Sequence, residues 1–431
     1  MVAQVSIPLI ALLGVLVIGL IFLRKLPLGV LLALAAIVST IAAGMGVPIR
    51  HIVEGTFVYL NVILVCITGM IFLQVLEESG SSVVISRSIV SRLYTHPVLL
   101  LATVMVLLLV PSMLTGVAVT TVLSTGVLVT PILISMGIPA ATVGSIVALG
   151  AILGMIAPPT NLLGMILAQG INAPYEGFDL PCFLLSVPPA IIIGICLGLP
   201  HIRKKEKPAL SQILDTLPEV NWEKSSLVAW LPFIVVIGLM TVTRLFPSAI
   251  PDLGTPLIFV IGAIVAMWAG QEKVNLFRAT QRALSGPMLS VIEVLVGVGI
   301  FVQLATLTGV RGLLVVGSLA LPNVWAYVAA AVALVMGSGL LSPFGSSSII
   351  GVPFALYFMG KNQIIVMSAL SLIASVGQLA PPTAIVGRLT AELENIEYRD
   401  LVKKSLPWAA VLVIISLVTI IYADQIGAFL L

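Results

Sequence analysis

Charged residues are scarce in this chain of 431 residues. Asp, Glu, Lys and Arg together make up 9% of it, whereas hydrophobic residues make up 60%. Soluble domains contain about a quarter charged residues, and the mean hydropathy here is +1.23. These values exclude a soluble globular protein and indicate a polytopic integral membrane protein.

Cysteine and histidine are also rare, with three of each. The cysteines share no metal-like spacing and the histidines fall in predicted loops, so we expect no transition-metal site, no disulfide framework and no catalytic histidine. A glycine-rich phosphate loop of the Walker type is missing, which argues against ATP use within the chain. We therefore expect neither an enzyme nor a cofactor nor a nucleic-acid partner, and the lipid bilayer is the first expected partner.

What the chain does contain is one phrase in two copies. Gly-x-x-Ala-Pro-Pro-Thr-x-x-x-Gly occurs at 154–164 and again at 377–387, inside strongly apolar sequence. Two prolines remove backbone donors and clash with the preceding turn, so each copy predicts a membrane helix broken at mid-depth. Broken backbone in lipid is tolerated only where protein or a water-filled cavity covers it. Paired breaks in two halves of a chain are typical of a secondary transporter's binding site.

Apolar runs define the expected layout. Two of them, 97–135 and 313–358, carry a polar, glycine-rich patch in their middle and predict re-entrant hairpins with protein-covered tips. The Ala-Pro-Pro-Thr helices span about 140–170 and 361–392. Simple spanning helices are expected at 5–23, 27–46, 57–77, 182–200, 227–246, 256–270, 286–308 and 405–423. The expected organisation is N-terminal scaffold helices at 1–52, a first repeat at 53–200, a cytoplasmic linker at 201–226, further scaffold helices at 227–280 and a second repeat at 281–431.

Basic residues test this layout, because Lys and Arg concentrate in cytoplasmic loops. With the linker inside the cell, 15 of the 20 Lys and Arg residues fall in cytoplasmic segments. Four fall outside and Arg388 lies within a span. The layout therefore predicts a multi-pass protein of the inner (plasma) membrane with both termini outside.

The two halves repeat with a regular spacing. The two copies of the phrase differ by 223 residues throughout, and so do Thr115-Gly116 and Ser338-Gly339, one pair in each hairpin. A weaker echo, at a spacing of 229, relates Gly80 to Gly309. Because the first hairpin enters from the cytoplasm and the second from outside, the halves are inverted-topology repeats. The expected fold class is an all-α polytopic membrane protein whose repeats each carry a re-entrant hairpin and a Pro-broken helix.

Hairpin tips and helix breaks that meet at the midplane expose helix ends. Half-helix N-termini suit a carboxylate or other anion, and half-helix C-termini with nearby hydroxyls suit sodium. The expected cation-binding residues are Ser112, Thr115, Gly116, Ala157, Pro159, Thr160, Ser338, Gly339, Gly377, Ala380, Pro382 and Thr383. The expected substrate-binding residues are Asn161, Ser342, Ser346 and Arg388. The alternative, prolines and glycines that only kink helices for packing, does not explain why the phrase and its hairpin are duplicated together.

Two charged residues within or near spans each have two interpretations. Glu293 is either a proton carrier, since ionisable groups inside membranes are functional as a rule, or a partly hydrated structural carboxylate. Arg388 either attracts an anionic substrate or pairs with Glu392 one helical turn later.

On these motifs the chain resembles the ion transporter superfamily, and within it the large permease subunit of TRAP (tripartite ATP-independent periplasmic) transporters. The matching stretches are Thr115–Gly126 followed by Pro131, Gly137–Pro139, Gly150–Thr160, Gly377–Thr383 and Leu406-Pro407. One stretch departs from the family pattern: residues 251–259 lack the Thr-Glu-Ala that TRAP large subunits usually carry near the start of their second half.

The resemblance implies a sodium-coupled symporter of a small organic anion, such as a dicarboxylate or another carboxylate, with sodium as the coupling ion. It also implies an elevator mechanism, in which the hairpins and broken helices slide against a scaffold. A small membrane subunit and a periplasmic binding protein are the implied partners, and a homodimer is left open. The alternative is a proton-coupled transporter or cation/proton antiporter of the same superfamily that acts without partner subunits.

Overall fold

The structure is a computed structural model that describes residues 2–22, 26–202, 217–218, 224–245, 251 and 253–430. These residues form helices and turns and contain no strand. Most of the expected cytoplasmic linker lies outside the described residues, with Arg203, Lys204, Lys205 and Lys207, and so do Arg24 and Lys25. The prediction of an all-α fold is confirmed.

The first half runs from two long helices through a hairpin to a broken helix. Its elements are α1 (Val2–Phe22), α2 (Leu28–Ala42), α3 (Ile49–Phe57), α4 (Leu60–Glu78), α5 (Ser81–Leu93), α6 (Pro97–Thr115), α7 (Ala118–Thr121), the π-helical turn η1 (Val122–Gly126), α8 (Val127–Ser135), α9 (Ala140–Gly154), α10 (Leu162–Gly170) and α11 (Asp179–Ile202).

The second half has the same order of elements. They are η2 (Val228–Trp230), α13 (Leu231–Leu245), α14 (Gly254–Ala269), α15 (Leu276–Ala283), α16 (Pro287–Leu307), α17 (Val310–Leu319), α18 (Asn323–Ser346), the π-helical turn η3 (Ser347–Gly351), α19 (Val352–Tyr357), α20 (Gln363–Val376), the 3₁₀ turn η4 (Gly377–Leu379), α21 (Ile385–Leu393), α22 (Tyr398–Ile421) and α23 (Ala423–Leu430).

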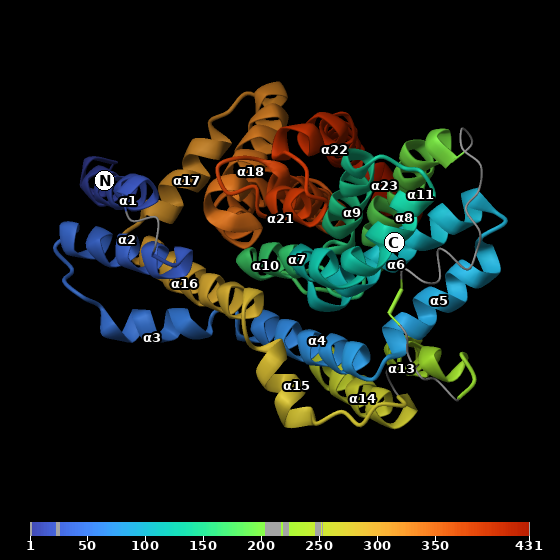
Figure 1. Cartoon of the computed structure of the whole chain (residues 1–431). Helices are drawn as coiled ribbons and strands as arrows, with labels where there is room; N and C mark the ends of the chain where they lie inside the picture. Colours follow the sequence, from blue (N-terminus) through green and yellow to red (C-terminus); the bar gives the residue numbers. More distant parts are fainter. Residues whose placement is uncertain are drawn as a thin grey trace.

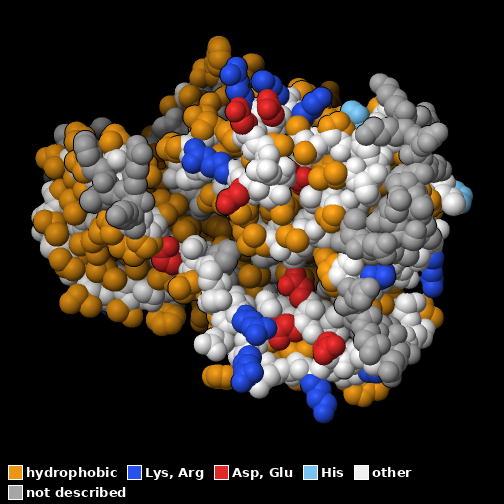
Figure 2. Space-filling view, in the orientation of Figure 1, with side chains coloured by type: hydrophobic (Ala, Val, Ile, Leu, Met, Phe, Trp, Pro, Cys, Tyr) orange, Lys and Arg blue, Asp and Glu red, His pale blue; other side chains and the backbone are white. Residues whose placement is uncertain are grey.

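Seven stretches of the described chain are long and apolar enough to cross a membrane. They are apolar on nearly all sides, as expected of helices that face lipid on one side and protein on the other. One of the seven, residues 323–357, is a bent pair and not a single rod. Among the side chains coloured by type, those at the left of the molecule, where α1 and α2 lie in Figure 1, are mostly hydrophobic in Figure 2, whereas most charged side chains lie elsewhere. A large apolar outer surface of this kind requires lipid around it.

In an outer scaffold, helices of each half pack against helices of the other half. Helix α16 of the second half packs against α2 and α3 of the first, and α4 of the first half packs against α14 and α15 of the second. Figure 1 shows the first group at the left and the second along the bottom. Glycines allow the closest approach: a Cβ on Gly297 would lie 2.3 Å from Gly29 Cα. Small residues of this kind let membrane helices pack backbone to backbone.

Each half contains one helical hairpin. In the first, α6 ends at Thr115, Gly116 takes a left-handed φ of 68°, and the returning arm begins at Ala118. In the second, the turn is at Ser342, with φ 61° and ψ 164°. The second hairpin begins at Asn323 and not at 313, because residues 310–319 form a separate helix, α17. Pro322 lies between the end of α17 and the start of α18.

Each half also contains the expected broken helix. Helix α9 ends at Gly154 and α10 begins at Leu162, while α20 with η4 ends at Leu379 and α21 begins at Ile385. The Pro158-Pro159 and Pro381-Pro382 bonds that connect them are both cis. The duplicated phrase therefore interrupts a helix in both halves, as predicted from its two prolines.

The spacing between the halves differs from element to element. It is 223 for the broken helices, as predicted, since α9 and α10 begin at 140 and 162 and α20 and α21 at 363 and 385. In the hairpins it is 226, which relates Gly116 to Ser342, the two residues with positive φ at the turns. The predicted equivalence of Thr115-Gly116 with Ser338-Gly339 is therefore wrong by three residues. The prediction failed because Thr115-Gly116 and Ser338-Gly339 are similar in sequence at a spacing of 223. The turn of the second hairpin is at Ser342 and contains no glycine.

Candidate functional site

The first hairpin tip (Thr115–Val117) lies against the first helix break. The Thr160 hydroxyl at the break donates to the carbonyl of Met113 in the hairpin. Gly116 is required here for a second reason besides its φ, because a Cβ would lie 2.2 Å from Leu162 Cγ at the start of α10. Thr160 is fully buried. Tip and break thus form one packed unit.

The second hairpin tip (Leu341–Pro343) repeats this arrangement. The hydroxyl and the backbone N–H of Thr383 both donate to the Gly339 carbonyl, at 2.9 and 3.1 Å. Met113 and Gly339 differ by 226 and the two threonines by 223, so this is the same contact in both halves. A Cβ on Gly339 would lie 2.7 Å from the Ala380 carbonyl oxygen and 2.5 Å from that of Pro381. Backbone carbonyls of the break therefore point at the hairpin.

Glycines at the ends of the unbroken helices fix the same packing. A Cβ on Gly154 would lie 2.6 Å from the Leu109 carbonyl oxygen, and one on Gly377 would lie 2.6 Å from that of Val335. Leu109 and Val335 again differ by 226. Only glycine allows these approaches without a shift of backbone.

The hydroxyls of the two hairpins are used differently. In the first, Ser112 and Thr121 are 2.5 Å apart and hydrogen-bonded to each other. In the second, the buried hydroxyls of Ser338, Ser342 and Ser347 have no hydrogen-bond partner among the described residues. Buried hydroxyls are almost always paired, so these three are groups that could coordinate a cation such as sodium together with carbonyls.

A cavity of about 420 Å³ lies between the two tips. This central cavity is lined by Val117, Ala118, Val119, Leu123, Met155, Ser290, Val291, Val294, Ser342, Pro343, Phe344, Gln378, Ile385, Leu389 and Glu392. Both tips, both breaks, α21 and the scaffold helix α16 contribute to it. Its volume is within the range of small-molecule sites.

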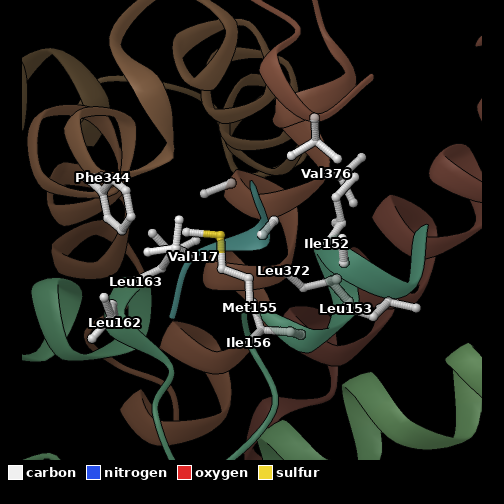
Figure 3. Close-up of a cluster of buried hydrophobic side chains, with 14 of the residues drawn as sticks. Val117, Ile152, Leu153, Met155, Ile156, Leu162, Leu163, Phe344, Leu372 and Val376 are labelled. Carbon is white, nitrogen blue, oxygen red and sulfur yellow. The ribbon is translucent and has the colours of Figure 1, made fainter. Parts of the chain in front are cut away.

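Met155 and Gln378 meet at the wall of the central cavity. They are equivalent by the 223 spacing, and the Gln378 amide donates to the Met155 sulfur at 2.8 Å. The axis that relates the halves therefore passes between these two residues. Figure 3 shows the Met155 side chain pointing toward Val117, with Phe344 of the second hairpin on the same side.

Three helix N-termini lie at the central cavity. Val117–Val119 begin the returning arm of the first hairpin, Ser342–Phe344 begin that of the second, and Ile385 begins α21. Free N–H groups and the positive end of the helix dipole make such termini favourable for an anion. No Lys, Arg or His is among the lining residues of this described cavity.

The expected substrate-binding residues are not gathered at one place. Ser342 lines the central cavity. Asn161 caps α10 by accepting from Gly164 N and donates to Ser371 at 2.8 Å, so its amide is committed within the packed core. Ser346 donates to the Leu334 carbonyl at 2.9 Å, inside its own hairpin.

Arg388 lies outside the lining of the central cavity. Its guanidinium is 6.0 Å from the centre of the Tyr398 ring, a cation–π contact. Within the described chain it makes no ion pair with Glu392, so the expected i,i+4 pair is not formed. Of the two interpretations of Glu293, the structure supports the structural one, since its carboxylate accepts from Val30 N at the start of α2.

Several lining residues were not singled out in the sequence. Ser290 and Val294 come from a scaffold helix whose apolar sequence carries no distinguishing motif, and Glu392 entered only as a partner for Arg388. Ser338 was predicted, but Ser347, which lies outside the cavity lining, was not, although Ser112 and Thr121 lie 226 residues before these two serines. That spacing becomes visible only once the turns are aligned.

A second carboxylate, Glu394, is buried at the end of α21. Thr130 of the first hairpin donates to one of its oxygens at 2.5 Å, and the other has no partner among the described residues. Burial raises the pKa of this carboxyl to about 7, against the opposing effect of the Thr130 hydrogen bond. Glu394 links the first hairpin to the end of the second broken helix.

Comparison with known proteins agrees with this architecture. The chain matches the solved crystal structure of the Alcanivorax borkumensis YdaH transporter, described as having an unusual topology, with a TM-score of 0.57 and 17% identity over 87% of this chain and 86% of that one. At this identity the likeness shows the fold alone. No curated protein matches the sequence.

A family model matches most of the chain. It is that of the tripartite ATP-independent periplasmic transporter, DctM component, and it covers residues 109–426. The match includes both hairpin turns, both helix breaks and all lining residues of the central cavity. The chain therefore belongs to the DctM family, the large membrane component of tripartite ATP-independent periplasmic transporters.

Proposed function

We propose that this chain transports a small organic anion together with sodium across the inner membrane, by an elevator movement of its hairpins and broken helices. The observation that carries this proposal is the convergence of three helix N-termini on a cavity with no basic side chain among its described lining residues. Helix ends supply the positive potential for an anion, while the adjacent carbonyls and unpaired serine hydroxyls suit sodium.

The basic residues support an orientation for the proposed cycle. The central cavity is lined by the start of α16 and by α21 from its first turn to its last. The start of α16 and the end of α21 adjoin segments with Arg278, Arg282, Arg399, Lys403 and Lys404, which the positive-inside rule assigns to the cytoplasm. On this assignment the structure is an inward-facing state, and both termini face outward.

The coupling ion is tested by replacing sodium with choline at constant ionic strength. For the purified chain in lipid nanodiscs, sodium should raise the Tm more than choline, because an ion that binds only the folded state stabilises it. In proteoliposomes that also contain the family's small membrane subunit and binding protein, uptake of an organic acid should require sodium. Uptake that is unchanged in choline would favour the proton-coupled alternative instead.

A further inference from the structure

The scaffold is hydrogen-bonded to the block of hairpins and broken helices at the corner between α3 and α4. This corner consists of Val58 and Tyr59, which separate the two helices. The Tyr59 hydroxyl lies 2.6 Å from the Ser348 hydroxyl in η3 of the second hairpin, and the two are hydrogen-bonded. The side-chain amide of Gln169, near the end of α10, donates to the Val58 carbonyl. Two adjacent scaffold residues are thus bonded to a hairpin of one half and a broken helix of the other.

The bond between Tyr59 and Ser348 is buried. Each of the two residues is only 2% exposed. Buried hydroxyls are almost always paired, and a buried hydroxyl that loses its partner costs more free energy than the bond itself contributes. The bond therefore stabilises the arrangement in which it forms. A movement that separates the two hydroxyls has to leave them unpaired or provide them with new partners.

The two elements bonded to the corner, η3 and α10, pack tightly against each other. A Cβ on Gly351, the last residue of η3, would lie 2.7 Å from Leu167 Cδ2 in α10. A Cβ on Gly170, the last residue of α10, would lie 2.2 Å from Val352 Cγ2. Such close packing transmits a displacement of one element to the other. We therefore expect η3 and α10 to leave the corner together when the block slides.

We infer that Tyr59 is a positioning residue for transport: its hydroxyl holds Ser348, and with it the second hairpin, in the inward-facing position. A hydrogen bond between two hydroxyls extends to only about 3 Å, so a displacement of the block along α4 breaks it. The loss of this bond is then part of the step to the outward-facing position. The inference rests on the proposed elevator movement and names a contact that this movement has to break.

Pulsed EPR on the full chain in lipid nanodiscs measures the position of the block. Spin-labelled cysteines replace Gln281 on α15 of the scaffold and Lys404 on α22, which packs against the broken helices through α9 and α20; both positions are exposed. The background is Cys196→Ser, because Cys196 is exposed whereas Cys66 and Cys182 are buried. The labelled chain with Tyr59 in place should show mainly one distance, that of the inward-facing position.

Tyr59→Phe should raise the ratio of a second distance to the first at least about fivefold, because the inward-facing position alone loses a bond and keeps an unpaired Ser348 hydroxyl. Ser348→Ala should act in the same direction. The double variant should fall short of the sum of the two, since both substitutions remove one bond. Tyr398→Phe is the matched control: its hydroxyl also makes a 2.6 Å bond, to the Leu379 carbonyl, but both partners lie in the block. It should leave the ratio unchanged.

Three results would overturn the inference. If the labelled chain shows two distances and neither Tyr59→Phe nor Ser348→Ala changes their ratio, the bond does not hold the block, while the elevator movement stands. A rise of equal size in Tyr398→Phe would mean that the loss of any tyrosine hydroxyl has this effect. If every variant shows one unchanged distance with and without sodium, the elevator movement is wrong and the inference with it. The sodium dependence of Tm still tests the coupling ion in that case.

Discussion

Thr160 and Thr383 each donate a hydroxyl hydrogen bond from a helix break to a hairpin. The proton of each hydroxyl is used in the bond to Met113 or Gly339, which leaves oxygen lone pairs for a cation. The sequence predicted the hydroxyl oxygen of each threonine as a cation ligand. It did not predict that the same hydroxyl donates a hydrogen bond to the hairpin.

Thr383→Val should weaken sodium binding about tenfold or more. Valine keeps the volume of threonine but removes the hydroxyl, as ligand and as donor to Gly339, while the backbone N–H bond to Gly339 remains. Thr383→Ser, which keeps the hydroxyl, should retain most of the affinity. The measurement is the sodium dependence of Tm for the three proteins. Equal sodium dependence in the valine variant would remove Thr383 from the proposed site.

Ser342→Gly should stabilise the fold and weaken substrate binding. Ser342 has φ 61° and ψ 164°, a region that is populated almost only by glycine and costs other residues about 1–3 kcal/mol. The first half has Gly116 at the equivalent turn. Thermal unfolding without ligand should therefore show a higher Tm. Loss of the hydroxyl from the cavity should raise the Kd of an organic anion, and a Tm below that of the wild type would contradict the strain.

At the residue scale the sequence predicted the broken helices well and the turns less well. The duplication of the proline phrase indicated its role, which two adjacent prolines alone would not, because Pro188-Pro189 lie inside the continuous helix α11. The second turn escaped prediction because Gly339 lies near it, while the turn itself is at a serine that the surrounding packing holds at positive φ.

At the scale of elements, glycine contacts hold each hairpin to its broken helix. Gly154→Ala should destabilise the chain by about 1–3 kcal/mol, since its Cβ would lie 2.6 Å from the Leu109 carbonyl oxygen. Gly14→Ala in α1 is the control, because nothing lies within 4 Å of its Cβ. It should be neutral or slightly stabilising through helix propensity. Thermal unfolding in nanodiscs measures both, and equal effects of the two substitutions would contradict tight packing at the break.

Glu394 makes the contact between the first hairpin and α21 sensitive to pH. Its pKa is raised from 4.5 to about 7 in the folded chain, so the folded state binds more protons than the unfolded state between these values. The stability contributed by this group is thus present below pH 4.5 and is lost as the pH rises through 7.

Glu394→Gln should remove that part of the pH dependence. Relative to the wild type, the variant should gain Tm at pH 8 by about 2–4 °C, the equivalent of about 1 kcal/mol, and gain nothing at pH 5. The exposed Glu397→Gln variant should follow the wild type at both values. A Tm difference for Glu394→Gln that does not change with pH would show that the carboxyl does not titrate in this range.

Short elements were the least predictable. The apolar runs located most of the long helices, but α3, α5, α15 and α23 were not foreseen, because they are short or amphipathic and give no long apolar run. Helix α17 was absorbed into the second hairpin for the opposite reason, since its apolar sequence continues the run that follows it.

At the scale of the whole molecule, the proposed elevator movement requires the block of hairpins and broken helices to slide past α16. Val291 on α16 and Leu389 on α21 both line the central cavity. Cysteines at these two positions, linked by a short bifunctional thiol reagent in a Cys196→Ser background, should abolish uptake. Reduction of the link should restore it.

The control for this experiment lies within the scaffold. A link between cysteines at Gly19 and Leu31, which pack together on α1 and α2, should leave uptake unchanged. Uptake that survives the Val291–Leu389 link would contradict sliding of the block against α16.

The packing of first-half helices against second-half helices in the scaffold also affects the order in which the chain inserts and folds in the membrane. Phe72 of α4 is fully buried, with ring centres of Phe233 and Phe259 each 6.0 Å away, and both partners are synthesised more than 150 residues later. Until α13 and α14 have entered the membrane, the Phe72 side of α4 lacks these two aromatic partners, although α6 already packs against another part of α4. The N-terminal half is therefore not a self-sufficient folding unit, and its insertion is completed only when the second half arrives.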